Sequence, residues 1–192
     1  LLVPVVTFYL LRDWDLLVAR VRALLPRRIE PTVSKLARES DAVIGAFLRG
    51  QFIVMAALGI IYSLGLAIIG LDFSLLIGLV AGLVSFVPYL GLIIGILIAS
   101  IVAILQFHSL MSVIPVLIVF GIGQMISDLA LTPALIGDRI GLHPVAVLFA
   151  VLAGGHLFGF FGVLLALPVA AIIAVLLRHA QDKYLQSAFY GD

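Results

Sequence analysis

Four charged side chains stand isolated in a long apolar stretch of this sequence. Between positions 51 and 177 the only acidic or basic residues are Asp72, Asp128, Asp138 and Arg139. One charge at the centre of a bilayer costs roughly 2.5–3.5 kcal/mol, so it should face a cavity, a partner or an ion. A carboxylate removed from water also binds a proton more readily, which suits it to carry protons.

Asp128 is the strongest candidate for a proton-binding or ion-binding group. Gln124 precedes it on the same apolar segment, and Thr132 and Pro133 follow it. In the competing interpretation, Asp128 only caps the end of its helix at the aqueous edge of the membrane. The first interpretation predicts an ion or solute pathway through positions 124–144.

The same stretch holds four more residues that could act on a solute. Asp138 and Arg139 predict a structural charge pair or an interfacial loop, and in a functional role Arg139 would attract an anionic solute. His143 stands directly before Pro144, and proline is an ordinary residue in the first turn of a helix. His143 and Pro144 are therefore candidates for a helix start or for a pathway site.

Two breaks of glycine and proline interrupt the apolar segments, and broken hairpins of this kind often mark a transporter's binding site. Freed carbonyls and half-helix ends can there coordinate ions or anionic groups. Tyr89 could contact a solute or anchor at the headgroups, and His156 could relay protons or only pack. The candidate residues of the two breaks are Ser85, Pro88, Tyr89 and Gly91, and Gly154, Gly155, His156 and Gly159.

The segments that carry these residues indicate a membrane protein, because 64% of the chain is hydrophobic and only 11% is charged. A water-soluble domain needs a polar face, which positions 51–177 lack, whereas in a bilayer apolar residues can face lipid. The expected fold is all-α, a polytopic integral membrane helical bundle with Gly/Pro-broken hairpins. Its predicted apolar segments are 52–69, 74–106, 110–127, 145–153 and 158–177.

The segment 74–106 is too long for one crossing of the membrane. Its break at 85–91 fits either two crossings joined by a tight turn or a re-entrant hairpin whose tip lies at membrane depth. The sequence leaves both arrangements open.

Charge divides the chain into four regions. Eight of the eleven Lys and Arg residues lie in the first 49 positions, which places that side and the C-terminus in the cytoplasm. Helical spacing of apolar residues makes 12–50 an amphipathic helical insert that lies on the inner leaflet, a helix that packs against neighbouring subunits, or a solvated connector. The predicted regions are 1–11, the end of a truncated transmembrane helix; 12–50, the cytoplasmic insert; 51–177, the transmembrane core; and 178–192, a cytoplasmic tail.

Several functions are excluded by what the sequence lacks. There is no cysteine, so neither a disulfide framework nor a Cys-ligated metal is expected. No nucleophile elbow, phosphate-binding loop or zinc helix is present, and we expect no enzyme, no metal and no cofactor. Acidic residues dilute the basic cluster near the N-terminus, which argues against nucleic-acid binding.

Two motifs of this sequence resemble a signature of the autoinducer-2 exporter family, the PerM-like permeases. The resemblance extends over the whole chain, as roughly the C-terminal half to two-thirds of a member. A break similar to the family's earlier Pro-Gly break is Phe86-Val87-Pro88-Tyr89-Leu90-Gly91. The two motifs are Leu131–Pro144, and Gly154-Gly155, Phe158-Gly159, Gly162 and Leu167-Pro168.

The resemblance implies a multi-pass protein of the bacterial inner membrane that exports a small organic solute such as autoinducer-2. Some relatives are described as proton- or sodium-coupled antiporters, so either ion is an expected partner beside the bilayer and the solute. A homo-oligomer is also expected, because small-residue helix faces allow close association. The alternatives are a passive channel, a sodium–proton antiporter without an organic substrate, and an interaction module that uses 12–50.

Overall fold

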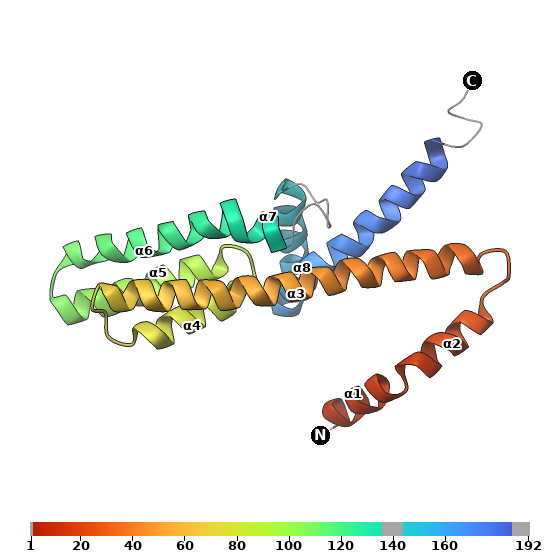
Figure 1. Ribbon diagram of the computed structural model, residues 1–192, viewed down its shortest axis with the longest axis horizontal. Coiled ribbons are helices and arrows are strands. Elements are labelled where there is room, and N and C mark those ends of the chain that lie inside the picture. The colour runs from red at the N-terminus through yellow and green to blue at the C-terminus, as the bar shows by residue number, and fades with distance from the viewer. Residues whose placement is uncertain (1, 136–143, 186–192) are drawn as a thin grey trace. The chain divides into compact units, whose positions relative to one another are not determined.

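The computed structural model describes residues 2–135 and 144–185, and its regular elements there are all helical. Their order is shown in Figure 1. Four of the helical stretches are long and apolar enough to cross a membrane: Glu30–Ile68, Leu90–Phe107, Leu110–Leu135 and Val145–Leu185. The predicted all-α membrane bundle is thus confirmed at the level of fold class. The chain divides into two units, Leu1–Asp41 and Ala42–Asp192.

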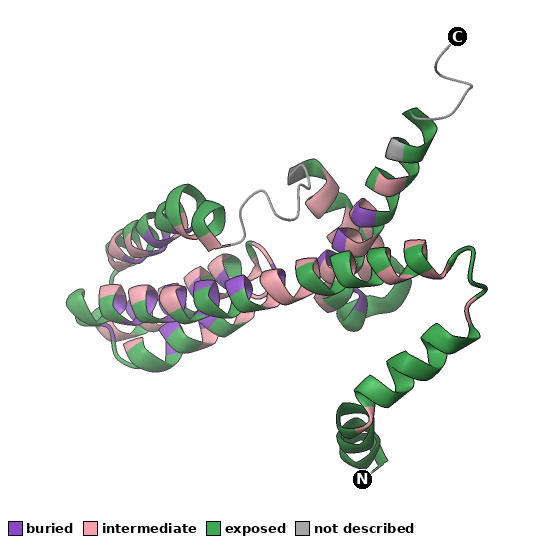
Figure 2. Cartoon of the chain, turned by 45° about the vertical axis from the view of Figure 1, so that its right-hand side comes forward, coloured by how far each residue is buried: buried purple, intermediate pink, exposed green. Residues whose placement is uncertain are grey.

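The first unit contains two short helices and the start of a long one. Helix α1 spans Leu2–Arg12 and α2 spans Trp14–Leu24, and neither contains a buried residue (Figure 2). Pro26 and the turn after it end this pair, and Pro31 lies in the first turn of α3, as its fixed φ favours.

Helix α3 runs without interruption from Glu30 to Ile68. The sequence predicted an amphipathic helix that starts near Pro31 and a spanning helix over 52–69, and both lie in this one continuous helix. Nothing between 32 and 68 breaks a helix, since no proline occurs there and the glycines tolerate helical geometry. The helix ends as predicted at Gly70, whose φ of 73° closes the last turn while Leu71 N–H bonds to the Leu66 carbonyl at 3.0 Å.

The predicted break inside 74–106 is confirmed. It separates α4 (Ser74–Val84) from α5 (Leu90–Phe107). Helix α4 rises only about 16 Å and α5 about 27 Å at 1.5 Å per residue, against roughly 30 Å of hydrocarbon. The two members of this pair therefore differ in reach, and only α5 has the length of a crossing helix.

The next run is helical almost throughout. A 3₁₀ turn (η1, Leu110–Ser112) leads into α6 (Val113–Ile126), a π-helical segment (η2, Ser127–Leu131) and α7 (Thr132–Leu135). The sequence predicted that the apolar segment ends before Asp128 and that a loop containing Pro133 follows. Instead the backbone stays helical to Leu135, because its turns widen at Ser127–Leu131 rather than unwinding.

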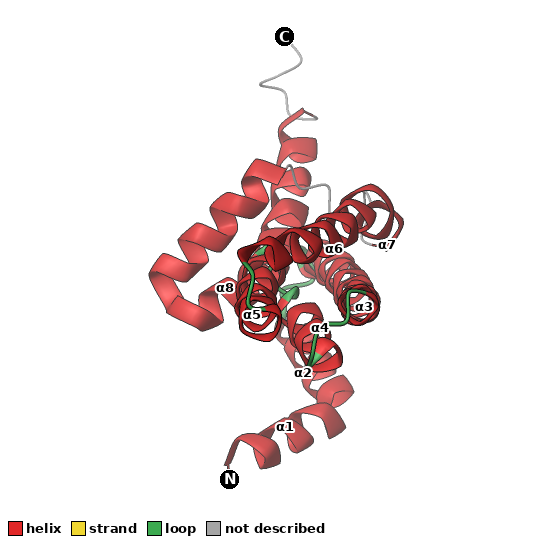
Figure 3. Cartoon of the chain, turned by 90° about the vertical axis from the view of Figure 1, so that its left-hand side faces the viewer, coloured by secondary structure: helices red, strands yellow, loops and turns green. Residues whose placement is uncertain are grey.

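Helix α8 (Pro144–Leu185) is two arms of a hairpin (Figure 3). The arms meet at Gly159, whose φ of 61° and ψ of −142° are non-helical. The sequence predicted a break over 154–159, but only Gly159 departs from helical geometry. Pro168 lies inside the second arm without ending it.

Small residues set the packing of the second unit. A Cβ on Gly82 would lie 2.6 Å from the Gly59 nitrogen, so α3 and α4 approach at backbone distance. A Cβ on Gly95 would lie 2.8 Å from the Ala81 side chain, which brings α5 equally close to α4. The core formed between α3, α4, α5 and α6 includes Leu58, Tyr62, Leu66, Ile77, Ala81, Ala99, Ala103, Val116 and Phe120.

Candidate functional site

Asp128 is the only charged residue of the helical run from Leu110 to Leu135. It lies in the π-helical segment Ser127–Leu131, directly after the buried Ser127. A π turn inserts an extra residue into the helix and leaves backbone groups less regularly paired, and such turns are frequent at functional sites. The structure thus places the predicted ion-binding carboxylate on an irregular part of an otherwise regular helix.

The pairing of α6 with α3 gives the depth of Asp128. A Cβ on Gly65 would lie 3.2 Å from Val119 Cγ2, and one on Gly123 would lie 3.0 Å from Tyr62 Cδ1, so the two helices are antiparallel. Continuing this register puts Asp128 near the level of Ala57. At 1.5 Å per residue that level is about 9 Å from Gln51 and about 20 Å from Gly70, the two ends of the apolar part of α3. Asp128 therefore lies within the apolar thickness of the bundle.

An open groove of about 480 Å³ runs past this carboxylate. Gln124 Nε2 donates a hydrogen bond of 2.9 Å to Asp128 Oδ1, which orients the carboxylate from one turn away. Apart from these two residues the walls are apolar, a pattern typical of sites for small ligands. The lining residues are Leu92, Ile96, Leu117, Gly121, Gln124, Met125, Asp128 and Leu129.

Tyr62 is a second polar group near Asp128, and sequence reasoning missed it. Its side chain is fully buried in α3, its ring centroid lies 4.4 Å from that of Phe120, and its hydroxyl has no hydrogen-bond partner among the described residues. The Asp128 charge lies within electrostatic reach of this hydroxyl. A buried hydroxyl without a partner costs about 1–3 kcal/mol, so it calls for an explanation. The position of Tyr62 in the sequence, within an apolar segment and before its end, did not indicate this role.

The predicted break at Ser85–Gly91 has a different character, because its polar groups are paired. Gln51 Nε2 in α3 donates to the carbonyls of Ser85, at 2.8 Å, and Phe86, at 3.3 Å, and Ser85 Oγ donates to the Ala81 carbonyl at 2.8 Å. Gln51 is also absent from the predicted site residues, since the sequence marked it only as the start of an apolar segment. We call these four residues, Gln51, Ala81, Ser85 and Phe86, the turn clamp.

The other candidates of this break flank the turn clamp. Pro88 lies in the turn, and Tyr89 follows it in the left-handed region, with φ of 65°, and with its side chain exposed. Gly91 is necessary where it stands, because a Cβ there would lie 2.7 Å from the Ser85 nitrogen. None of Ser85, Pro88, Tyr89 or Gly91 lines the Asp128 groove, although Leu92, directly after Gly91 in the first turn of α5, does.

The third group of candidates forms the α8 hairpin. A Cβ on Gly154 would lie 2.5 Å from the Gly162 carbonyl oxygen, and one on Gly155 would lie 3.0 Å from Val163 Cγ2, so the arms touch through their glycines. His156 is exposed beside the tip at Gly159. None of these residues lines the Asp128 groove.

The remaining candidates are placed as follows. Thr132 and Pro133 lie in α7, one turn beyond Asp128, and Pro144 begins α8. Asp138, Arg139 and His143 lie outside the described residues. Within the described ranges, no three His, Asp or Glu side chains are grouped closely enough to hold a metal ion.

Comparison with known proteins gives the family. The model of the AI-2E family transporters matches residues 1–182. YrrI of Bacillus subtilis (strain 168), which its name describes as a transport protein, is 33% identical over 92% of this chain and 50% of its own length. PerM of Escherichia coli (strain K12), named as a permease, is 30% identical over 94% of this chain and 51% of its own length.

The chain thus spans about half the length of the curated relatives that it matches, and no solved structure matches it. The matched family is the one that the motifs around Pro88, Asp138 and Gly159 indicated. With the family model covering nearly all of its residues, the chain belongs to the AI-2E family of membrane transporters.

Proposed function

We propose that this chain forms part of a secondary transporter that exports a small organic solute, of the type of autoinducer-2, and that Asp128 couples export to protons or sodium. The observation that carries the proposal is one exposed carboxylate, on a π-helical segment of an otherwise apolar helical run, at the wall of an open groove. Membership of a transporter family supports the class of activity. The identity of the solute, the coupling ion and the coupling role of Asp128 go beyond family membership and belong to the proposal.

The chemistry of Asp128 favours a coupled carrier. Its carboxylate is exposed, and its single hydrogen bond from Gln124 leaves the second oxygen without a donor among the described residues. An ionised carboxylate at this depth is expensive, and one proton or one sodium ion cancels its charge. Alternate neutral and charged states of Asp128 would then favour different arrangements of the surrounding helices, which is the requirement for coupling.

The surrounding elements supply the parts of an alternating-access mechanism. Helices α3, α4 and α5 pack at backbone distance through Gly59, Gly82 and Gly95, which gives a rigid partner. The π segment and the tip at Gly159 are irregular, and irregular backbone is where transporters place their binding and moving parts. In this mechanism the α8 hairpin enters the membrane only partway and moves relative to the rigid helices.

A flux experiment on the full-length protein tests the proposal. The protein is reconstituted in liposomes, a sodium gradient is imposed, and internal pH and the efflux of a loaded furanone solute are recorded. Asp128→Asn should lose ion-driven flux by at least tenfold while Asp72→Asn, which removes an exposed carboxylate in the loop after α3, should keep it. Equal flux in all three proteins would remove the coupling role of Asp128.

The passive channel is distinguished by the same preparation. A channel would release the solute without any gradient, and the rate would not depend on Asp128. A sodium–proton antiporter without an organic substrate would change internal pH and leave the furanone inside. Either outcome would replace the proposed function by that alternative.

A further inference from the structure

Helix α2 has one continuous apolar face that no described residue covers. At 100° per residue, five large apolar side chains fall on one side of Trp14–Leu24, and Leu16, Ala19 and Ala23 fall on the other. The exposed fraction of these five side chains is between 44% and 84%. An exposed stripe of this kind marks a surface that meets a membrane or another protein. The stripe consists of Trp14, Leu17, Val18, Val21 and Leu24.

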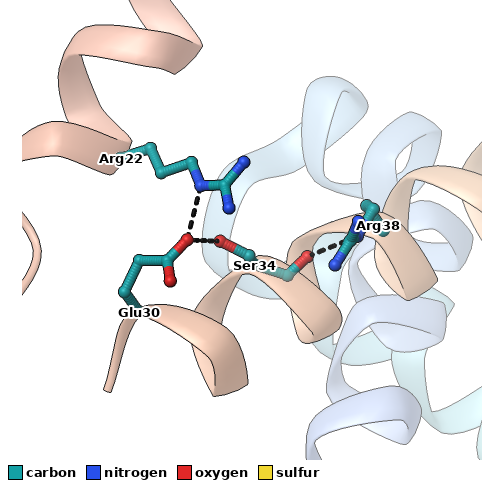
Figure 4. Close-up of polar contacts among 4 residues, drawn as sticks. All are labelled: Arg22, Glu30, Ser34 and Arg38. Atoms are coloured by element: carbon teal, nitrogen blue, oxygen red, sulfur yellow. Dashed lines mark hydrogen bonds and ion pairs between the residues drawn. The ribbon is translucent and has the colours of Figure 1, made fainter. Parts of the chain in front are cut away.

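Three arginines without described partners lie on α2 or in the turn that follows it. Among the described residues, Arg12 pairs with Asp13 at 2.9 Å, and Arg22 pairs with Glu30, which also accepts a hydrogen bond of 3.2 Å from Ser34 (Figure 4). Arg20, Arg27 and Arg28 are exposed and form no hydrogen bond or ion pair there. The three guanidinium groups are therefore free to bind anions.

One contact lies directly before α2, and another holds α2 to the helix that follows it. Directly before α2, the Arg12 guanidinium lies over the Tyr9 ring, 4.7 Å from the centroid, in the last turns of the mostly apolar α1. At its C-terminal end, the pair of Arg22 with Glu30 ties α2 to the first turn of α3. A tyrosine and an arginine at the end of an apolar helix are typical of the membrane–water interface. This pattern fits a start of α2 at that interface.

We propose that α2 lies on the cytoplasmic leaflet, with its apolar stripe among the acyl chains and Arg20, Arg27 and Arg28 bound to the phosphates of anionic phospholipids. The stripe supplies affinity for any bilayer, and the arginines supply the preference for anionic headgroups. Charge decides against a neutral protein surface as the occupant, because three unpaired guanidinium groups beside the stripe would then lose water without gaining an anion. The transporter would thus respond to the anionic lipid content of its membrane through α2.

Site-directed labelling of the full-length protein tests this surface. The chain has no cysteine, so Val21→Cys on the stripe and Ala23→Cys on the opposite face provide a matched pair once any cysteines elsewhere in the protein are replaced. Each is labelled with an environment-sensitive fluorophore in vesicles of phosphatidylcholine, with or without phosphatidylglycerol, and quenched by spin-labelled lipid. We expect lipid quenching at position 21 only, and stronger quenching when phosphatidylglycerol is present.

Two charge variants separate the lipid from other occupants. Arg20→Gln, Arg27→Gln and Arg28→Gln together should weaken the binding of α2 to phosphatidylglycerol relative to phosphatidylcholine roughly a hundredfold, at about fivefold for each arginine. Lys35→Gln, Arg38→Gln and Arg49→Gln remove the same charge from α3 and should leave the preference intact. Circular dichroism confirms that both variants remain helical.

Two results would overturn the proposal. Equal access of water to positions 21 and 23 in anionic vesicles would show that the stripe does not enter lipid. Protection of position 21 from both water and spin-labelled lipid would show that a second copy or another part of the protein covers it.

Discussion

The turn clamp and the Asp128 groove both hold polar side chains among apolar helices. They differ in how many of their polar groups have a hydrogen-bond partner. In the turn clamp, Gln51 and Ser85 are buried and bonded to carbonyls of the turn. At the groove, Asp128 has one hydrogen bond, from Gln124, and the buried Tyr62 hydroxyl within electrostatic reach of it has no partner among the described residues. Paired groups stabilise a fold, whereas unpaired ones cost free energy and persist where function requires them. We therefore interpret the turn clamp as structural and the groove as functional.

The largest difference in stability is expected between two glycines, one in each region. Gly91→Ala would place a methyl group against the Ser85 nitrogen and the Ala81 carbonyl, and should cost about 3 kcal/mol or more. Gly121→Ala meets nothing within 4 Å on the exposed face of α6 and should gain up to about 1 kcal/mol. Unfolding in mixed micelles measures both. An equal change in the free energy of unfolding for the two variants would show that the turn clamp is not tightly packed.

Two glutamines give the next contrast. Gln51→Leu leaves the carbonyls of Ser85 and Phe86 without their donor, and should cost about 1–3 kcal/mol. Gln124→Leu removes one bond to an exposed carboxylate and should change stability by less than about 1 kcal/mol, while it lowers flux. The same unfolding assay and the liposome assay measure the two effects. A larger stability loss in Gln124→Leu would reverse the assignment of the two regions.

Tyr89 tests whether backbone strain near the turn clamp serves function. Its φ of 65° is unfavourable for a residue with a side chain, so Tyr89→Gly should stabilise the protein by up to about 1 kcal/mol. Solute efflux should fall if the ring binds solute and stay unchanged if the ring only anchors at the headgroups. A lower free energy of unfolding for Tyr89→Gly would show that the backbone at this position is not strained.

The last contrast concerns Tyr62. Tyr62→Phe removes a buried hydroxyl without a described partner and keeps the ring beside Phe120, so the free energy of unfolding should rise by about 1–3 kcal/mol. Flux should nevertheless fall, because the Tyr62 hydroxyl is, beside the Gln124 amide, the second polar group near Asp128. Unchanged flux with unchanged stability would remove Tyr62 from the site.

Much of the fold could be predicted because its signals are local. Gly70 and Gly159 permit a positive φ and Pro88 lacks a backbone donor, and the helices or helical arms end at or near these residues. The uninterrupted α3 and the π segment at Asp128 could not be predicted, because no residue type marks where a polar helix enters a membrane or where a helix widens. These features depend on neighbours that are distant in the sequence.

The candidate site was predictable only in part, for the same reason. A lone carboxylate in an apolar segment can be recognised from the sequence alone, and Gln124 lies one turn away from it. Gln51 and Tyr62 act through contacts with residues 34 and more positions distant, such as the bond from Gln51 to Ser85. Only the packing of α3 against α4, α5 and α6 brings such partners together.

The most direct test of the central claim measures flux and stability of Asp128→Asn in the same preparation. The full-length protein and the variant are reconstituted in liposomes, internal pH is recorded under an imposed sodium gradient, and unfolding is measured on the same protein. We predict that the variant loses ion-driven flux and unfolds no more easily than the parent, because a neutral amide is less costly than a carboxylate at this depth. Retained flux, or a large loss of stability, would show that Asp128 holds the fold together rather than coupling transport.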